Sequence, residues 1–134
     1  MLGEQVGESK GKITARRVLP SDGGAKVEVS FEGPGTLLGS ETFEIGTYWS
    51  VVRPDGTLYG EGQGLAMTKD GSSATWVGQG AGRFTGQGTG VSWRGAIYYQ
   101  SASPKLARLN GIAAVFEHES DAAGNFVSKL WEWK

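Results

Sequence analysis

The 134-residue sequence contains no cysteine and only one histidine, His118. The absence of cysteine excludes disulfides, thiolate nucleophiles and thiolate metal sites. A single histidine also excludes a multi-histidine metal site within one chain. We therefore expect no metal and no cofactor, and no catalytic residue is assigned from a motif.

Neither sign of charge predominates, because 13 lysine and arginine residues stand against 14 aspartate and glutamate residues, for a formal net charge of −1. This balance gives no electrostatic reason to expect nucleic acid or an anionic membrane as a partner. No apolar run approaches the roughly 20 residues of a membrane-spanning helix, and the first residues lack the apolar segment of a signal peptide. We expect a cytoplasmic protein that binds neither nucleic acid nor a membrane.

Glycine, in contrast, is abundant, with 23 residues, and it recurs at every second position within residues 60–64, 78–82 and 86–90. Successive side chains of a β-strand point to opposite faces, so each run leaves one face of a strand bare. Glycine weakens a strand by about 0.5–1 kcal/mol relative to alanine, so these runs indicate a geometric need. That need is either sharp coiling of the sheet or the close approach of a bulky group.

Turn signals divide the chain into extended segments, and no window of a dozen residues has helical periodicity. Glycine, asparagine and aspartate tolerate the positive φ of hairpin turns, and they cluster around residues 21–24, 54–56, 69–71 and 121–125. The predicted strands cover residues 4–9, 12–19, 26–31, 36–38, 42–53, 57–68, 74–84, 88–100, 113–120 and 126–134.

The exception is the segment 101–111, which has the signals of one helical turn. Ser103 is a suitable N-cap, Pro104 suits the first helical position, and a glycine follows at the end. Its two leucines, Leu106 and Leu109, are spaced to plug one end of the sheet structure.

Long antiparallel strands joined by short turns are compatible with a sandwich or a closed barrel. Strands of ten or more residues must coil strongly, alternating glycines provide sites for curvature, and closure removes exposed edges. We therefore predict an all-β fold over residues 1–134, a single domain that forms an eight-stranded antiparallel closed barrel with one short helical turn.

Apolar side chains occur on both faces of some strands. In the strand 42–53, the face that carries Phe43, Ile45 and Trp49 is interpreted as the core face, and the last strand has large apolar residues on both sides. A barrel needs only one apolar face, so another copy of the chain would cover the second in a homo-oligomer. Alternatively, the tryptophans of the last strand pack beneath the terminal segment and the helical turn.

The strand 113–120 offers two alternative sites. If the Phe116 face is interior, His118 could act as a general base or orient a ligand. If the opposite face is interior, Glu117 and Glu119 form a close carboxylate pair, and one of them has a raised pKa. Only one of the two arrangements can hold.

The segments Asp55–Gly64, Gly78–Gly86 and Gly90–Trp93 resemble the central strands of allene oxide cyclase-like barrels, and most closely the small, mostly uncharacterised bacterial relatives of that plant enzyme. The likeness covers roughly residues 40–134. It implies a calycin-like eight-stranded barrel with an apolar cavity, and assembly into dimers or trimers. It does not carry the cyclase chemistry across, because Gly7–Gly11 offers a glutamate and a serine without the asparagine of that family.

These observations favour a binding module that holds a small apolar molecule in the lumen of the barrel. The alternatives are an isomerase- or cyclase-type enzyme on the same barrel, and a filled barrel that acts by self-assembly. The free volume of the lumen distinguishes them. The candidate ligand-binding residues are Tyr48, Trp49, Trp76, Trp93, Tyr98 and His118.

Overall fold

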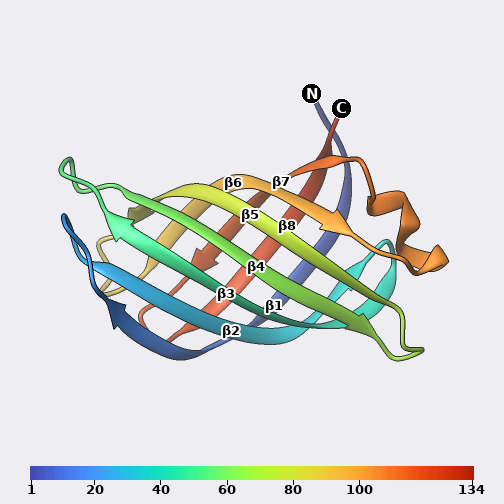
Figure 1. Cartoon of the computed structure of the whole chain (residues 1–134), viewed down its shortest axis with the longest axis horizontal. Helices are drawn as coiled ribbons and strands as arrows, with labels where there is room; N and C mark the ends of the chain where they lie inside the picture. The colour runs from blue at the N-terminus through green and yellow to red at the C-terminus, as the bar shows by residue number, and fades with distance from the viewer.

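Eight antiparallel strands follow one another in chain order in the computed structural model, which describes residues 1–134 (Figure 1). The first strand pairs with the last, and this pairing closes the sheet into a barrel. The predicted fold class is therefore confirmed. The strands are β1 (Leu2–Leu19), β2 (Lys26–Leu37), β3 (Ser40–Val52), β4 (Leu58–Thr68), β5 (Ser73–Phe84), β6 (Val91–Gln100), β7 (Ala113–Ser120) and β8 (Asn125–Trp133).

β1 and β2 are each continuous, although the sequence pattern predicts two pieces for both. The bend in β1 is absorbed by a register shift between Ile13 and Ala15. At Gly33 the backbones of the two strands come so close that a Cβ there would overlap the backbone of Lys10. Bulges and glycine let a strand bend without ending, and this is why both strands continue.

The third glycine run forms a loop rather than the start of a strand, contrary to the prediction. Gly86 and Gly88 have φ angles of 84° and 60°, a left-handed conformation that glycine adopts at no steric cost. β6 consequently begins at Val91 and not at Gly88.

The predicted helical turn is present as η1 (Pro104–Leu109), a 3-10 helix between β6 and β7. Leu106 and Leu109 are fully buried and belong to the main apolar core. η1 therefore plugs one end of the barrel, where it stands out beyond the strands in Figure 1. No helix of the structure has the length and apolar character needed to cross a membrane.

The glycines of β4 and β5 face the lumen, and at some of them, as at Gly46 of β3, a large side chain from a neighbouring strand occupies the space above. An eight-stranded barrel is just wide enough for side chains to fill, so an aromatic ring on one strand requires a bare position on the next. A Cβ at the paired glycine would overlap or crowd the ring in each case. The pairs are Phe31 with Gly46, Trp76 with Gly64 and Trp93 with Gly82.

The face of β3 interpreted as core from the sequence is the outer face, and this prediction is wrong. Glu44 and Tyr48 point into the lumen, while Phe43 and Ile45 are 42% and 44% exposed. The physical reason is Gly46, which must face inward because the Phe31 ring fills the space over it.

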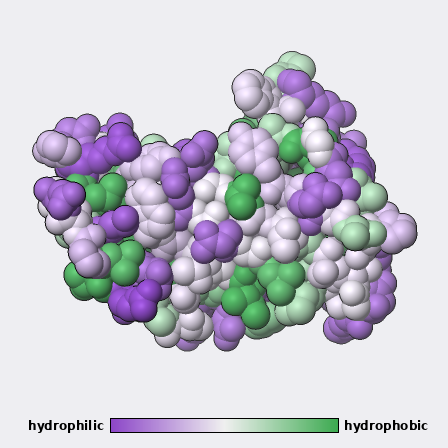
Figure 2. Space-filling model, in the orientation of Figure 1, coloured by the Kyte–Doolittle hydropathy of each residue, from purple (hydrophilic) through white to green (hydrophobic).

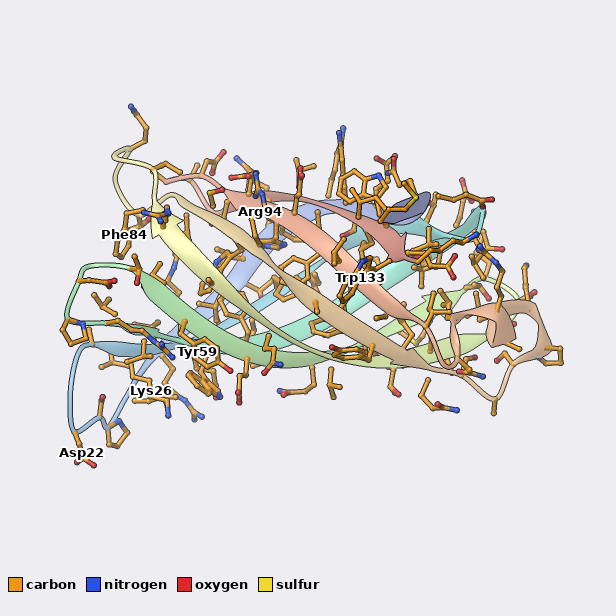
Figure 3. The ribbon with its side chains drawn as sticks, turned by 90° about the horizontal axis from the view of Figure 1, so that it is seen from above. Asp22, Lys26, Tyr59, Phe84, Arg94 and Trp133 are labelled. Atoms are coloured by element: carbon orange, nitrogen blue, oxygen red, sulfur yellow. The ribbon has the colours of Figure 1, made fainter.

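On the outer face, Trp49 is part of a stack of aromatic and cationic side chains. The Lys26 Nζ lies 4.5 Å from the centroid of the Trp49 ring, and the Tyr59 ring packs on the other side at 5.8 Å. Lys26 and Tyr59 lie near each other toward one end of the barrel (Figure 3). Cation–π and edge-to-face contacts of this kind explain a tryptophan on the outside of the barrel.

Candidate functional site

The lumen contains a cavity of about 80 Å³. Part of its wall has no side chains, because Gly60 pairs with Gly80 and Gly62 pairs with Gly78 across β4 and β5. No lysine or arginine lines it. The other lining side chains are largely aromatic or apolar, and they include Phe31, Tyr48, Trp76, Trp93, Ile97, Phe116, His118 and Leu130.

Glu44 places a carboxyl group in the wall of this cavity. Its Oε1 accepts a hydrogen bond from Ser9 Oγ at 3.1 Å, and its Oε2 accepts one from Trp76 Nε1 at 3.1 Å. Burial raises the pKa of Glu44, and the two hydrogen bonds oppose that shift by favouring the carboxylate. The pKa of the buried Tyr99 hydroxyl is raised mainly by burial and further by the negative charge of Glu44.

His118 lies among three aromatic rings. It stacks on Phe126 at 5.1 Å and meets Phe31 edge-on at 5.7 Å, and Tyr48 lies 6.4 Å away. Burial lowers the pKa of His118 to about 4, and the nearby Glu119 carboxylate opposes this shift only in part. The imidazole is therefore neutral at pH 7, with one nitrogen able to donate and the other able to accept a hydrogen bond.

The Phe116 face of β7 is thus the interior face, and the alternative carboxylate pair is not formed in the lumen. Glu117 and Glu119 lie outside, where both face Arg94 on β6. The Arg94 Nη1 lies 2.7 Å from Glu119 Oε1. These groups are solvated, and an exposed pair of this kind contributes at most about 1 kcal/mol.

Tyr48 lies on β3 with Glu44, and Trp93 lies on β6 as the cross-strand partner of His118. Their rings meet edge-on with centroids 5.8 Å apart. Burial raises the pKa of Tyr48 to about 12, while the Trp93 indole and the positive charge of Arg16 lower it by smaller amounts. The Trp93 Nε1 is buried and lies beside the Tyr48 hydroxyl, without a hydrogen bond of standard geometry between them.

Four of the six candidate residues thus line one cavity: Tyr48, Trp76, Trp93 and His118. The other two, Trp49 and Tyr98, lie on the outer face, and Tyr98 is 44% exposed. Trp49 directly follows Tyr48, and Tyr98 directly precedes Tyr99, and both of these tyrosines face inward. Because adjacent residues of a strand point to opposite faces, Trp49 and Tyr98 face outward.

Glu44 and Phe31 are lining residues that the sequence analysis does not identify. The signal that could have found Glu44 is Gly46, since bare positions mark the lumen face and Gly46 shares that face with Glu44 and Tyr48. Phe31 has a similar signal, because it is the cross-strand partner of Gly46.

The fold and the lumen define the chain as a closed, eight-stranded antiparallel β-barrel protein with a small aromatic cavity. No protein-family model matches the sequence, and the curated proteins include no match to it. Solved structures do match.

One similar structure is a protein of unknown function from Clostridium acetobutylicum ATCC 824, with a TM-score of 0.84 and 15% identity over 98% of this chain and 97% of that one. Another is a conserved protein of unknown function from Rhodopseudomonas palustris, with a TM-score of 0.83 and 15% identity over the same shares. A third is a beta-barrel like protein from Acinetobacter baumannii AYE, with a TM-score of 0.82 and 16% identity over 100% of this chain and 96% of that one. At these identities the likeness establishes the fold alone.

Proposed function

We propose that the barrel binds a small, largely apolar molecule in its lumen. The observation that carries the proposal is the cavity of about 80 Å³, whose wall combines aromatic side chains with buried polar groups. Apolar lining with a few placed polar groups is typical of small-molecule sites. Trp76, Trp93, Tyr48 and His118 would contact the ligand.

The volume sets the size of that ligand. An apolar cavity of about 150 Å³ holds benzene, and sites for drug-sized ligands measure roughly 300–1,000 Å³. The cavity of about 80 Å³ therefore suits a molecule of a few non-hydrogen atoms. A larger ligand would require lumen side chains to change rotamer.

Xenon binding tests the cavity directly. We expect dissolved xenon to shift the NMR resonances of the Ile97 and Leu130 methyl groups, because both side chains line the cavity and apolar cavities bind xenon. The matched variant is Gly78→Ala, whose added methyl group faces the lumen with its nearest neighbour, the Ala96 carbonyl oxygen, 3.1 Å away. The variant should lose most of the shift. Unmoved methyl resonances in the wild-type protein would contradict the proposal.

An isomerase- or cyclase-type enzyme is the alternative function, and the half-buried Glu44 and the buried His118 favour it. A carboxyl with a raised pKa and a neutral imidazole beside one cavity are groups that can move a proton within a bound substrate. Under this proposal the chain is an allene oxide cyclase-like barrel, and the closed eight-stranded fold supports the relationship. The catalytic groups would differ from those of the plant cyclases, since Glu44 lies on β3 and not in the segment Gly7–Gly11.

Self-association through the outer face is the second part of the proposal. The outward-facing side chains within residues 43–51, 63–67, 75–81 and 96–100 include no charged residue, and the carboxylate of Glu61, which lies in register between Trp49 and Gln79, is at the border of this face. Figure 2 shows this side, with hydrophobic residues over its middle and strongly hydrophilic ones mostly toward the two ends. Cores of protein interfaces are depleted of charge, and an uncharged face brings no like charges together when it meets a second copy. The exposed apolar residues are Phe43, Ile45, Met67, Val77 and Tyr98.

Val77→Arg tests this face. Val77 is 59% exposed, and an arginine there would place like charges at the contact between copies. We expect a wild-type dimer or trimer by native mass spectrometry and analytical ultracentrifugation, and a monomer for Val77→Arg. Val18→Arg is the control, because Val18 is 80% exposed on β1, outside this face. A wild-type monomer, or equal effects of the two substitutions, would contradict self-association.

A further inference from the structure

Glu44 supplies the one carboxyl group in the wall of the lumen, and no positively charged side chain faces it. The lining of the cavity includes no lysine or arginine. Glu61 is also a lining residue, but its carboxylate lies outside the barrel, where it accepts a hydrogen bond from the Tyr59 hydroxyl at 2.6 Å. A charge that is removed from water costs free energy unless it is paired. The lumen therefore has a negative group whose counter-ion can come only from a ligand.

The Glu44 carboxyl also retains free acceptor positions. The two oxygens of a carboxylate offer about four lone-pair sites, and the protein supplies one donor to each oxygen, Ser9 Oγ to Oε1 and Trp76 Nε1 to Oε2. Glu44 is half-buried rather than sealed, which leaves it open to a small molecule. Its two donors hold the carboxyl in one orientation. A fixed acceptor with free lone pairs favours a ligand that donates several hydrogen bonds.

Aromatic rings lie around this carboxyl. The Trp76 ring that donates to Glu44 is stacked on Phe31 at 6.3 Å. Tyr48 shares the lumen face of β3 with Glu44, and its ring lies 5.9 Å from that of Phe31. The faces of aromatic rings attract cations, most strongly where water is excluded. A carboxylate among aromatic rings is therefore a setting for an ammonium group and not for an anion.

We propose that the lumen binds a small alkylammonium ion, a protonated amine with an apolar body, and that its ammonium group pairs with the Glu44 carboxylate. The ammonium N–H groups donate to the free lone pairs of Glu44. The alkyl body lies against Ile97 and Leu130, which line the same cavity, and the volume of about 80 Å³ restricts it to a few carbon atoms. This inference rests on the proposed function, because it names the ligand class of the lumen site.

Three small probes test the inference: ethylammonium, which is a cation; ethanol, which is a neutral donor of nearly the same size; and acetate, which is an anion. Their binding is followed by titration with two-dimensional ¹H–¹⁵N NMR of the tryptophan indole groups. We expect ethylammonium to bind on the order of tenfold more tightly than ethanol, because hydrogen bonds between opposite charges are the stronger ones. It should shift the Trp76 N–H resonance, since that group donates to Glu44. Acetate should not bind detectably.

Glu44→Gln removes the charge and keeps the shape of the side chain. Its amide can accept from Trp76 through the oxygen and donate to Ser9 through the nitrogen, so both existing contacts keep a partner. Ethylammonium should then bind no more tightly than ethanol. The matched control is Glu61→Gln, which makes the same change outside the barrel and should keep the full preference. If Glu44→Gln does not fold, the Trp76 shift and the comparison of the three probes in the wild-type protein still decide the question.

The outcomes separate this inference from the proposed function. Ethanol or acetate that binds as tightly as ethylammonium, or a preference for ethylammonium that survives Glu44→Gln, would overturn the inference while the lumen still binds molecules. If no probe perturbs the Trp76 N–H or the methyl groups of Ile97 and Leu130, the proposed binding function fails together with it.

Discussion

Gly64→Ala is expected to destabilise the barrel by about 3 kcal/mol, at the upper end of the cost of overpacking a core. Gly64 is the cross-strand partner of Trp76, and a Cβ there would overlap the indole ring. The ring is stacked on Phe31 at a centroid distance of 6.3 Å, so moving it would disturb that contact. Displacing it would also break its hydrogen bond to Glu44, which would leave a half-buried carboxyl with one partner fewer.

The matched control is Gly78→Ala, which makes the same chemical change on the same lumen face. Its Cβ would meet nothing closer than the Ala96 carbonyl oxygen at 3.1 Å, with the Ile97 side chain at 3.5 Å. We expect its free energy of unfolding to stay within about 1 kcal/mol of the wild-type value, since alanine also lowers the entropy of the unfolded chain. Urea unfolding monitored by tryptophan fluorescence measures both variants. Similar losses of unfolding free energy in Gly64→Ala and Gly78→Ala would show that strand propensity, and not the Trp76 ring, explains why residue 64 is glycine.

Acidification from pH 7 to pH 4 is expected to remove about 3 kcal/mol of stability through His118 alone. The pKa of the buried imidazole is about 4, against 6.5 for the ordinary group, and each pKa unit corresponds to about 1.4 kcal/mol. Between these two values the unfolded chain binds more protons than the folded one, so the free energy of unfolding rises with pH. The stabilisation is complete above pH 6.5 and is lost as the pH falls toward 4.

The measurement is urea unfolding of the wild-type protein and of His118→Phe at several pH values between 4 and 8. The variant keeps an aromatic ring beside Phe126 and Phe31 and cannot titrate. Glu44 changes the free energy of unfolding in the opposite direction, because its raised pKa makes the folded protein less stable as the pH rises above 4.5. This effect is common to both proteins. The difference between their unfolding free energies therefore isolates His118. A difference that does not change with pH would contradict a buried neutral His118.

The extended segments and the helical turn could be predicted because they depend on local signals, and closure into eight strands could be predicted because long, strongly coiled strands leave exposed edges unless the sheet closes. Turn residues separate the strands, and the spacing of Leu106 and Leu109 fits one buried helical turn. The breaks predicted within β1 and β2 and the strand start at Gly88 were wrong for one reason. Glycine can bend a continuous strand or make a loop, and the local sequence does not say which.

The lumen was harder to predict, because the direction of a strand face is a collective property. Tyr48 and Trp49 are both aromatic neighbours on β3, and only the paired strands decide which one points inward. The apolar content of a strand face does not predict its direction here, since Phe43 and Ile45 lie outside the barrel while the acidic Glu44 lies inside.

By itself the sequence determined that glycine recurs with the strand period, and therefore that one face of β4 and β5 is bare. Only the tertiary structure decided what fills that space: the indoles of Trp76 and Trp93 over Gly64 and Gly82, and between them a cavity of about 80 Å³. The physical reason is that a bare strand position specifies room on one side of a chain. Which side chain enters that room depends on the register of the neighbouring strands and on the closure of the barrel.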